Sequence, residues 1–258
     1  MLDKIFYLNE QGSRASNEDS IFPQRGEATL EDRLFIVCDG VGGQNSGEIA
    51  SKITSNAIAE YLKTISYDKV TVKEIRMAIT HSREVMQDFV IRNPKSKSMC
   101  TTLALIYLAH DEAIIVWCGD SRIYHVRNGN VIWKSKDHSV VQQLVDEGEI
   151  TQEEALIHPE RNIIIHCIRP VKSYIKIDNH LIDNIQPNDS LLIVTDGVLE
   201  NINENKIKEI LGPLQTETDK EKLFQQYCEG KTSDNYSMYL LSFADNKRNH
   251  LNLKYEPN

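Results

Sequence analysis

Short apolar segments of strand length recur along most of this chain. Some alternate apolar with polar residues and others are apolar throughout, and both patterns are typical of β-strands. They cover residues 34–38, 102–108, 113–118, 123–126, 131–133, 190–194 and 237–243. Asn128-Gly129, between two of these segments, is the residue pair of a tight hairpin turn. The pattern therefore predicts antiparallel strands.

Two longer segments, residues 46–64 and 72–91, have the spacing of amphipathic helices. In the first, Ile49, Ile53 and Ala57 follow one another at intervals of four residues. Shorter helices are predicted over residues 139–147, 153–157, 204–211 and 220–228. Because the helices stand in blocks apart from the strands, we expect an α+β fold with antiparallel sheets covered by helices, not a doubly wound parallel sheet.

The domain organisation is predicted from the lack of internal boundaries. The sequence of 258 residues is 40% hydrophobic and 26% charged, as in ordinary globular proteins. It contains no long linker, repeat or low-complexity stretch. We expect one catalytic domain over residues 1–245, with residues 137–170 as a subdomain or flap. Residues 246–258 are polar and are predicted to form a C-terminal tail.

Charge and cysteine usage restrict the surroundings and the partners. The formal charge of −9 argues against a general nucleic-acid binder, because phosphate backbones select basic surfaces. Apolar runs fall well short of the roughly 20 residues that span a bilayer, and the first residues lack the layout of a signal peptide. Five cysteines, an odd number, lie mostly in apolar segments and fit free thiols. We therefore expect a cytoplasmic protein that binds neither nucleic acid nor membrane.

Four aspartates share one context: each follows or adjoins an apolar segment and lies next to Gly, Ser or Asn. They are Asp39, Asp120, Asp196 and Asp234. Strand ends in a layered fold can converge on one cleft, where carboxylates repel each other unless cations neutralise them. Oxygen ligands select hard ions such as Mg²⁺ or Mn²⁺ over zinc. The pattern is compatible with a site for such ions, although an Asp-Gly pair after a strand is also a common turn.

A second acidic group lies near the start of the chain. Arg14 precedes Glu18 and Asp19 by four and five residues. One interpretation is a solvated loop with a surface ion pair. The other is an arginine fork for a phosphoryl group beside metal-binding carboxylates. His138, in Asp137-His138-Ser139, is interpreted as part of a helix start capped by Asp137 or Ser139, not as a catalytic residue.

An ordered series of motifs over residues 12–243 resembles the metal-dependent serine/threonine protein phosphatases of type 2C, in a bacterial-type form. Each motif is weak alone, but the whole series in this order is specific. The motifs are Arg14-Ala15-Ser16-Asn17-Glu18-Asp19, Val37-Cys38-Asp39-Gly40-Val41-Gly42-Gly43, Gly47-Glu48-Ile49-Ala50-Ser51, Thr101-Thr102, Gly119-Asp120-Ser121-Arg122-Ile123-Tyr124, Asp137-His138-Ser139, His158-Pro159, Arg161-Asn162, Val194-Thr195-Asp196-Gly197 and Ser233-Asp234-Asn235.

The resemblance implies a four-layer αββα sandwich, in which helices flank two antiparallel β-sheets. It also implies the roles of individual residues. Asp39 would bridge two metal ions and act in catalysis, with the Gly40 carbonyl as a further ligand. Asp196 and Asp234 would complete that metal pair. Arg14 would bind the phosphate and act in catalysis. Glu18 and Asp19 would be nearby metal ligands that act partly through water. Asp120 would hold a third metal ion together with Asp196.

The implied activity is hydrolysis of phosphoserine and phosphothreonine in proteins by direct attack of a metal-bridging hydroxide. The cofactors would be Mn²⁺ or Mg²⁺, two per site with a possible third. The implied substrates are phosphoproteins, as targets of a serine/threonine kinase, and the enzyme would act as a monomer. The alternatives are a catalytically weak or inactive family member that binds phosphoproteins as a regulatory module, and a metal-dependent nuclease. The acidic charge and the absence of a basic stripe speak against the nuclease.

The chain departs from the family pattern at several positions. Val41 and Gln44 stand where relatives have histidine, and Cys100 stands where a glycine usually precedes the threonines. Glu200 replaces an aspartate, Ile168-Arg169-Pro170 occupies a segment that is usually small and apolar, and Asn235-Tyr236-Ser237 replaces Asn-Ile-Thr. None of these changes removes a predicted core metal ligand. They bear on the general acid, the third metal and the flap.

Overall fold

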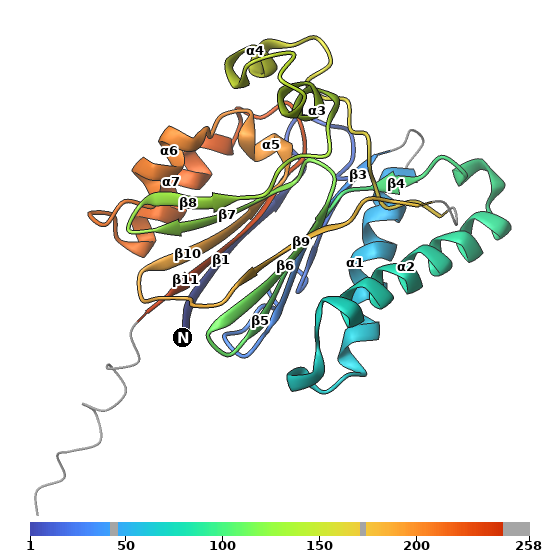
Figure 1. Cartoon of the computed structure of the whole chain (residues 1–258), viewed down its shortest axis with the longest axis horizontal. Helices are drawn as coiled ribbons and strands as arrows, with labels where there is room; N and C mark the ends of the chain where they lie inside the picture. The colour runs from blue at the N-terminus through green and yellow to red at the C-terminus, as the bar shows by residue number, and fades with distance from the viewer. Residues whose placement is uncertain (42–45, 171–173, 245–258) are drawn as a thin grey trace, which may run out of the picture.

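Two antiparallel β-sheets stack face to face in the computed structural model, which describes residues 1–41, 46–170 and 174–244 (Figure 1). The first sheet has the strand order β1-β11-β10-β7-β8, and the second has the order β2-β3-β5-β6-β9. The first consists of β1 Leu2–Glu10, β11 Tyr236–Phe243, β10 Asp189–Val194, β7 Arg122–Arg127 and β8 Asn130–Lys134. The second consists of β2 Asp19–Phe22, β3 Leu34–Val41, β5 Leu103–Ala109, β6 Glu112–Cys118 and β9 Asp178–Ile182, and the short β4 Cys100–Thr101 pairs with β3.

Helices cover the outer face of each sheet. The long helices α1 Ser46–Lys63 and α2 Val72–Arg92 pack against the second sheet, and α6 Glu204–Ile210 and α7 Glu217–Cys228 pack against the first (Figure 1). The short α5 Asp196–Leu199 directly follows β10. The 3₁₀ turns Tyr67–Lys69 and Pro94–Ser96 flank α2. The result is the predicted α+β sandwich of four layers.

Three apolar clusters fill the spaces between these layers. The central cluster lies between the sheets and includes Phe35, Trp117, Ile193 and Tyr239. A second joins α1 and α2 to β3, β5 and β6, and a third joins α6 and α7 to the outer face of the first sheet. Because β3, β5, β6 and β10 are covered on both faces, they are apolar along nearly their whole length, and this made them easy to predict from the sequence.

The predicted hairpin is present between β7 and β8. Asn128 and Gly129 have φ values of +50° and +79°, the left-handed conformations of a two-residue turn that follows the twist of the strands. The predicted helices are also present, with ends shifted by at most a few residues. Four strands were not predicted: β1, β2, β4 and β9. β1 and β9 are edge strands. β9 has only two apolar residues, and the short apolar run of β1, Ile5-Phe6-Tyr7-Leu8, is flanked by charged and polar residues.

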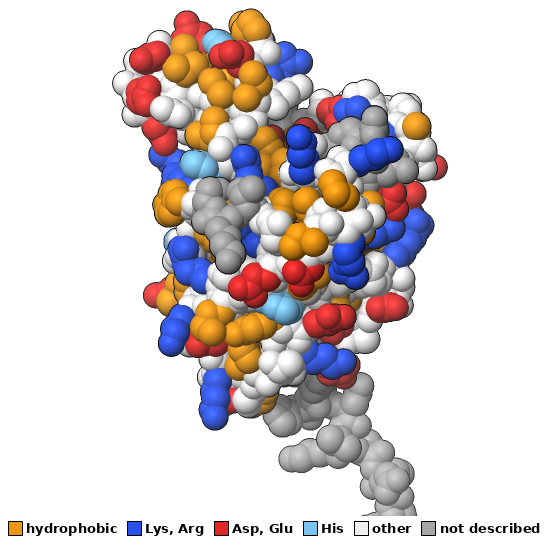
Figure 2. All heavy atoms as spheres, turned by 90° about the vertical axis from the view of Figure 1, so that its right-hand side faces the viewer, with side chains coloured by type: hydrophobic (Ala, Val, Ile, Leu, Met, Phe, Trp, Pro, Cys, Tyr) orange, Lys and Arg blue, Asp and Glu red, His pale blue; other side chains and the backbone are white. Residues whose placement is uncertain are grey.

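Residues 137–170 contain α3 Val140–Asp146 and α4 Gln152–Ile157, which stand at one end of the sandwich beyond the sheets (Figure 1). Figure 2 shows hydrophobic side chains gathered on this projecting end of the molecule. The exposed large apolar residues of the segment are Leu156, Ile157, Ile163 and Ile165. Gln44 and the expected tail 246–258 lie outside the described residues. Among those residues, no helix combines the length and the hydropathy needed to cross a membrane.

Candidate metal centre

The predicted acidic residues come from five separate segments. Asp19 opens β2 and lies opposite Asp39 of β3 in the antiparallel register. Asp120 lies in the turn between β6 and β7, Asp196 is the first residue of α5 directly after β10, and Asp234 lies just before β11. The charges of Asp19, Asp120, Asp196 and Asp234 all raise the pKa of the Asp39 carboxyl, because the fold brings these residues near it.

Two glycines allow the end of β3 to approach the start of α1. A Cβ atom on Gly40 would lie 2.1 Å from the carbonyl oxygen of Gly47, and a Cβ atom on Gly47 would lie 2.6 Å from the carbonyl oxygen of Gly40. The Gly40 amide donates to the carbonyl of Glu18 at 3.2 Å. Any side chain at either glycine would therefore push the backbone beside Glu18 and Asp39 out of place.

Two threonines fix the backbone of Asp39. The Thr101 hydroxyl donates to the Asp39 carbonyl at 2.7 Å, and the Asp39 amide donates to Thr102 Oγ1 at 2.9 Å. Thr102 Oγ1 is also 2.6 Å from the hydroxyl of Ser121, beside Asp120. These contacts join the Asp39 strand to the Asp120 turn. The sequence motifs contained these residues but gave no indication of their hydrogen-bond partners.

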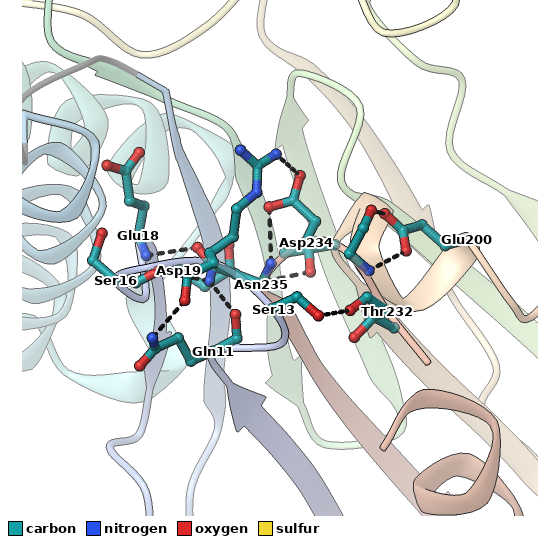
Figure 3. A network of polar contacts seen from close by, with 12 residues as sticks. Gln11, Ser13, Ser16, Glu18, Asp19, Glu200, Thr232, Asp234 and Asn235 are labelled. Carbon is teal, nitrogen blue, oxygen red and sulfur yellow. Dashed lines mark hydrogen bonds and ion pairs between the residues drawn. The ribbon is translucent and has the colours of Figure 1, made fainter. Parts of the chain in front are cut away.

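Asn235 connects the loop that carries Arg14 to the start of β11 (Figure 3). Its side-chain oxygen accepts from the Glu18 amide at 2.8 Å, and its side-chain nitrogen donates to the carbonyls of Gln11 at 2.7 Å and Ser16 at 2.8 Å. Asn235 was not predicted as a site residue. Its place next to Asp234 was the available signal, but the three contacts depend on a loop more than 200 positions away in sequence.

Glu200 supports the same region from the other side. Its carboxylate accepts from the Ser233 amide at 2.7 Å and from the Ser233 hydroxyl at 2.5 Å (Figure 3). Gly197 packs against this segment so tightly that a Cβ atom would lie 2.0 Å from the Asn235 carbonyl oxygen. The segment 233–235 is thereby held on both flanks of Asp234.

Arg14 lies at the open side of the carboxylate group. Its Nη2 atom is 2.6 Å from Asp234 Oδ2, and 59% of the Arg14 side chain is exposed. The hydrogen bond and the charge of Asp234, with smaller contributions from Asp196 and Asp39, raise the pKa of Arg14. The guanidinium is thus charged, largely accessible to solvent and next to the acidic residues.

Burial and crowding alter the acidity of the carboxyls. Burial, then the charges of Asp19 and Asp196, raises the pKa of Asp39 well above its usual range. Burial and then the charge of Asp196 raise the pKa of Asp120 to about 7. The pKa values of Asp19 and Asp196 are also raised, in each case mainly by burial. Without counter-ions these carboxyls therefore resist full ionisation.

The donor set fits divalent ions that prefer oxygen. The side-chain donors of the group are carboxylate oxygens, which suit Mn²⁺ or Mg²⁺. Asp196 Oδ1 is buried without a hydrogen-bond partner, and a buried acceptor of this kind needs a cation or water. Within the described ranges, no three acidic, histidine or cysteine side chains already form a complete metal-binding group. The charge of Asp196 raises the pKa of the Asp39 carboxyl, a repulsion that a bound cation would relieve.

The residues around His138 have structural roles. Ser139 caps α3 by accepting from the Gln142 amide at 3.3 Å, as predicted. Asp137 instead accepts two hydrogen bonds from Arg122, at 2.8 and 2.6 Å. His138 is buried, and its Nδ1 atom accepts from the Gly119 amide at 3.2 Å. Arg122 and His138 thus flank the turn that carries Asp120.

Comparisons with known proteins agree with this fold. The family model described as protein phosphatase 2C matches residues 11–230. A putative 2C-type protein phosphatase of Streptococcus pyogenes is 33% identical over 81% of this chain and 84% of its own length. The serine/threonine phosphatase stp of Listeria monocytogenes is 29% identical over 74% of this chain and 76% of its own length.

Solved structures show the same relationship. The structure of the Mycobacterium tuberculosis serine/threonine phosphatase PstP/Ppp has a TM-score of 0.80 at 28% identity, and the match covers 94% of this chain and 99% of that chain. The catalytic domain of PstP in complex with two manganese ions has a TM-score of 0.77 at 26% identity, over 94% and 98% of the two chains.

An αββα sandwich with clustered carboxylates and an arginine at one end defines a phosphohydrolase of the metal-dependent class. The chain belongs to the protein phosphatase 2C family. It is a protein serine/threonine phosphatase, as the motif series predicted. The interpretation as an inactive binding module is not supported.

Proposed function

We propose that Arg14 and the carboxylates around Asp39 carry out the reaction of this metal-dependent serine/threonine phosphatase. The observation that supports this assignment is the set of four aspartates whose charges act on Asp39 while Arg14 stands at their open side. Asp39, Asp196 and Asp234 would hold two Mn²⁺ or Mg²⁺ ions, together with the Gly40 carbonyl. Glu18 and Asp19 would contribute at the margin of the pair, and Asp120 with Asp196 would hold a third ion.

Bound ions of this kind polarise phosphoryl oxygens and lower the pKa of the attacking water. Arg14 would bind the phosphoryl oxygens through its planar fork of donors. In the structure the guanidinium binds Asp234 instead. Because neutralisation of Asp234 by a cation weakens that ion pair, Arg14 would turn to the phosphoryl group once the acidic residues are occupied.

The substrates would be proteins phosphorylated on serine or threonine. The structure adds a hollow of about 230 Å³ beside the Arg14 loop, which Gln11, Ser13, Thr232 and Tyr236 help to line. Its position suits the residues that flank the phosphorylated side chain. A eukaryotic-type serine/threonine kinase as the opposing enzyme, a monomeric state, a cytoplasmic location and one catalytic domain over residues 1–245 remain predictions from the sequence.

The deciding experiment is phosphate release from a phosphothreonine peptide with Mn²⁺, with Mg²⁺ and with a chelator in place of metal. We expect release only with metal. Arg14→Ala should raise KM for the peptide more than it changes metal affinity, whereas Asp39→Asn should weaken metal binding itself. Full activity of either variant would refute its assigned role, and metal-independent release would refute the mechanism.

A further inference from the structure

Two departures from the family pattern are brought together by the fold. Cys100 precedes Thr101 in β4, and Arg169 follows Ile168 in the segment that returns from α4. Thr101 and Ile168 form an antiparallel bridge with N···O distances of 3.0 and 2.8 Å. The residues on either side of such a bridge point to its opposite face, so Cys100, Cys167 and Arg169 share one side.

Arg169 contacts one of the two cysteines directly. Arg169 Nη2 donates to the sulfur of Cys167 at 2.9 Å. Cys100 lies on the same side of the bridge, close enough to this sulfur that each thiol shifts the pKa of the other. The carbonyl of Arg169 accepts from Arg83 Nε of α2 at 3.0 Å, which fixes the backbone of the arginine. The cluster therefore joins β4, α2 and the segment that returns from α4.

The hydrogen bonds favour one thiolate in this pair. The contact with Cys100 and then the guanidinium of Arg169 lower the pKa of the Cys167 thiol, and the same contact raises the pKa of Cys100. A cysteine beside an arginine is the environment in which thiolates form and react. Cys167 itself is only 1% exposed, but Cys100 is partly exposed and gives a small oxidant a route to the pair.

We propose that Cys100 and Cys167 are an oxidation site for hydrogen peroxide, at which a disulfide forms and slows the phosphatase. The thiolate sulfur of Cys167 would attack the peroxide, so that an S–O bond forms, the O–O bond breaks and hydroxide leaves. The sulfur of Cys100 would then attack the sulfenic acid, with formation of the S–S bond and loss of water. Two thiols lose two electrons in total, and the peroxide is reduced to two molecules of water.

The position of the pair explains why oxidation would affect catalysis. Cys100 is the neighbour of Thr101 in the chain. The Thr101 hydroxyl donates to the Asp39 carbonyl, and the Thr101 amide donates to the Ile168 carbonyl. A disulfide needs the two sulfurs at about 2 Å, much closer than a hydrogen-bonded pair of thiols, so β4 and the returning segment must shift. That shift would displace the backbone of Asp39. Transient disulfides of this kind are the form expected in a reducing compartment.

The test uses the reduced full-length protein loaded with Mn²⁺ and treated with hydrogen peroxide. After removal of the peroxide, free thiols are blocked under denaturing conditions and the peptides are mapped by mass spectrometry. We expect a cross-linked peptide pair containing Cys100 and Cys167, together with a loss of phosphate release of about tenfold that a reducing agent restores. The activity measurement rests on the proposed function, whereas the cross-linked peptide does not.

Three variants make the result specific. Cys100→Ser and Cys167→Ser should each retain basal activity, yield no cross-link and resist peroxide. Cys228→Ala, which changes a buried cysteine of α7, should remain as sensitive as the wild type. A cross-link of Cys167 to Cys118, an absent cross-link, or a Cys100→Ser variant that peroxide still inactivates would each overturn the proposal.

Discussion

At the scale of single residues, the site combines carboxylates that would be unfavourable in isolation. The charges of four other aspartates raise the pKa of the Asp39 carboxyl. Such a cluster is costly to assemble without cations, because each negative charge raises the pKa of the next. Its presence in the folded chain is therefore better explained by a demand of function than by stability.

We expect Asp39→Asn and Asp196→Asn to lower turnover by on the order of 10²- to 10³-fold, because each removes part of an interaction worth several kcal/mol in the transition state. Since each change also removes a repelling charge, the metal-free variants should unfold at the same temperature as the wild type or higher. Steady-state kinetics and thermal unfolding measure the two effects. Asp183→Asn, an exposed change in the loop between β9 and β10, is the matched control and should alter neither.

At the scale of elements, Asn235 is the contact that holds the Arg14 loop on β11. Asn235→Ala would remove three hydrogen bonds to residues 11–18. We expect kcat/KM to fall by about 10- to 100-fold, the usual range for residues that orient a metal site without touching it. Asn201→Ala removes one side-chain hydrogen bond, to Lys231, and is the control. Equal kinetics for the two variants would show that the loop needs no such anchor.

A second element-scale contact joins β7, β10 and the loop between β9 and β10. Asp189 is 1% exposed and accepts from Arg127 at 2.7 and 2.8 Å, from the Gln186 amide at 2.8 Å and from His125 at 2.9 Å. Burial alone would raise the pKa of Asp189, but the hydrogen bonds from Arg127 and its other partners lower it below the usual value. Asp189 therefore stabilises the fold only while it is ionised.

We expect Asp189→Ala to lower the free energy of unfolding by about 3–5 kcal/mol at neutral pH, because it leaves the buried His125 and the partly buried Arg127 without their carboxylate partner. Since the folded pKa is lowered, the stability from Asp189 is present above the unfolded pKa of about 3.9 and is lost as the pH falls through the folded value. Urea unfolding of both proteins should show a difference that is constant from pH 5 to 7 and shrinks below about pH 4. A difference independent of pH would exclude this ion pair as the cause.

The elements also show how much of the fold and site the sequence could predict. Strands covered on both faces, such as β5 and β10, and the Asn128-Gly129 turn were predictable, because their signals are local. β1 was not, because its apolar run of four residues is short and flanked by polar residues, and its partner β11 lies at the other end of the described chain. The acidic residues of the site could be found from motifs. The contacts of Asn235, Thr101 and Thr102 could not, because they depend on residues far apart in sequence.

At the scale of the whole molecule, the carboxylate cluster joins both sheets at one end of the sandwich. Asp19 and Asp39 belong to the second sheet, whereas Asp196 and Asp234 adjoin strands of the first. Repulsion across this group opposes the packing of the two sheets in the metal-free protein. Cations held between the sheets would reverse the sign of that interaction, so metal binding and global stability should be coupled.

This coupling gives an expected dependence on pH. The raised pKa values of Asp19 and of Asp120, the latter about 7, mean that the folded metal-free protein holds protons that the unfolded chain releases. The contribution of these two carboxyls to stability is therefore fully present below the unfolded pKa of about 3.9 and is lost as the pH rises through about 7. Mn²⁺ must displace the same protons, so its affinity should increase by about tenfold per pH unit for each proton released.

Thermal unfolding at pH 6, 7 and 8 should show a stabilisation by Mn²⁺ that grows with pH. The stabilisation should reach about 2.7 kcal/mol when the free metal is 100-fold above its dissociation constant. The Asp120→Asn variant should show a shallower increase, and an equal stabilisation at all three pH values would mean that these carboxyls do not hold the metal.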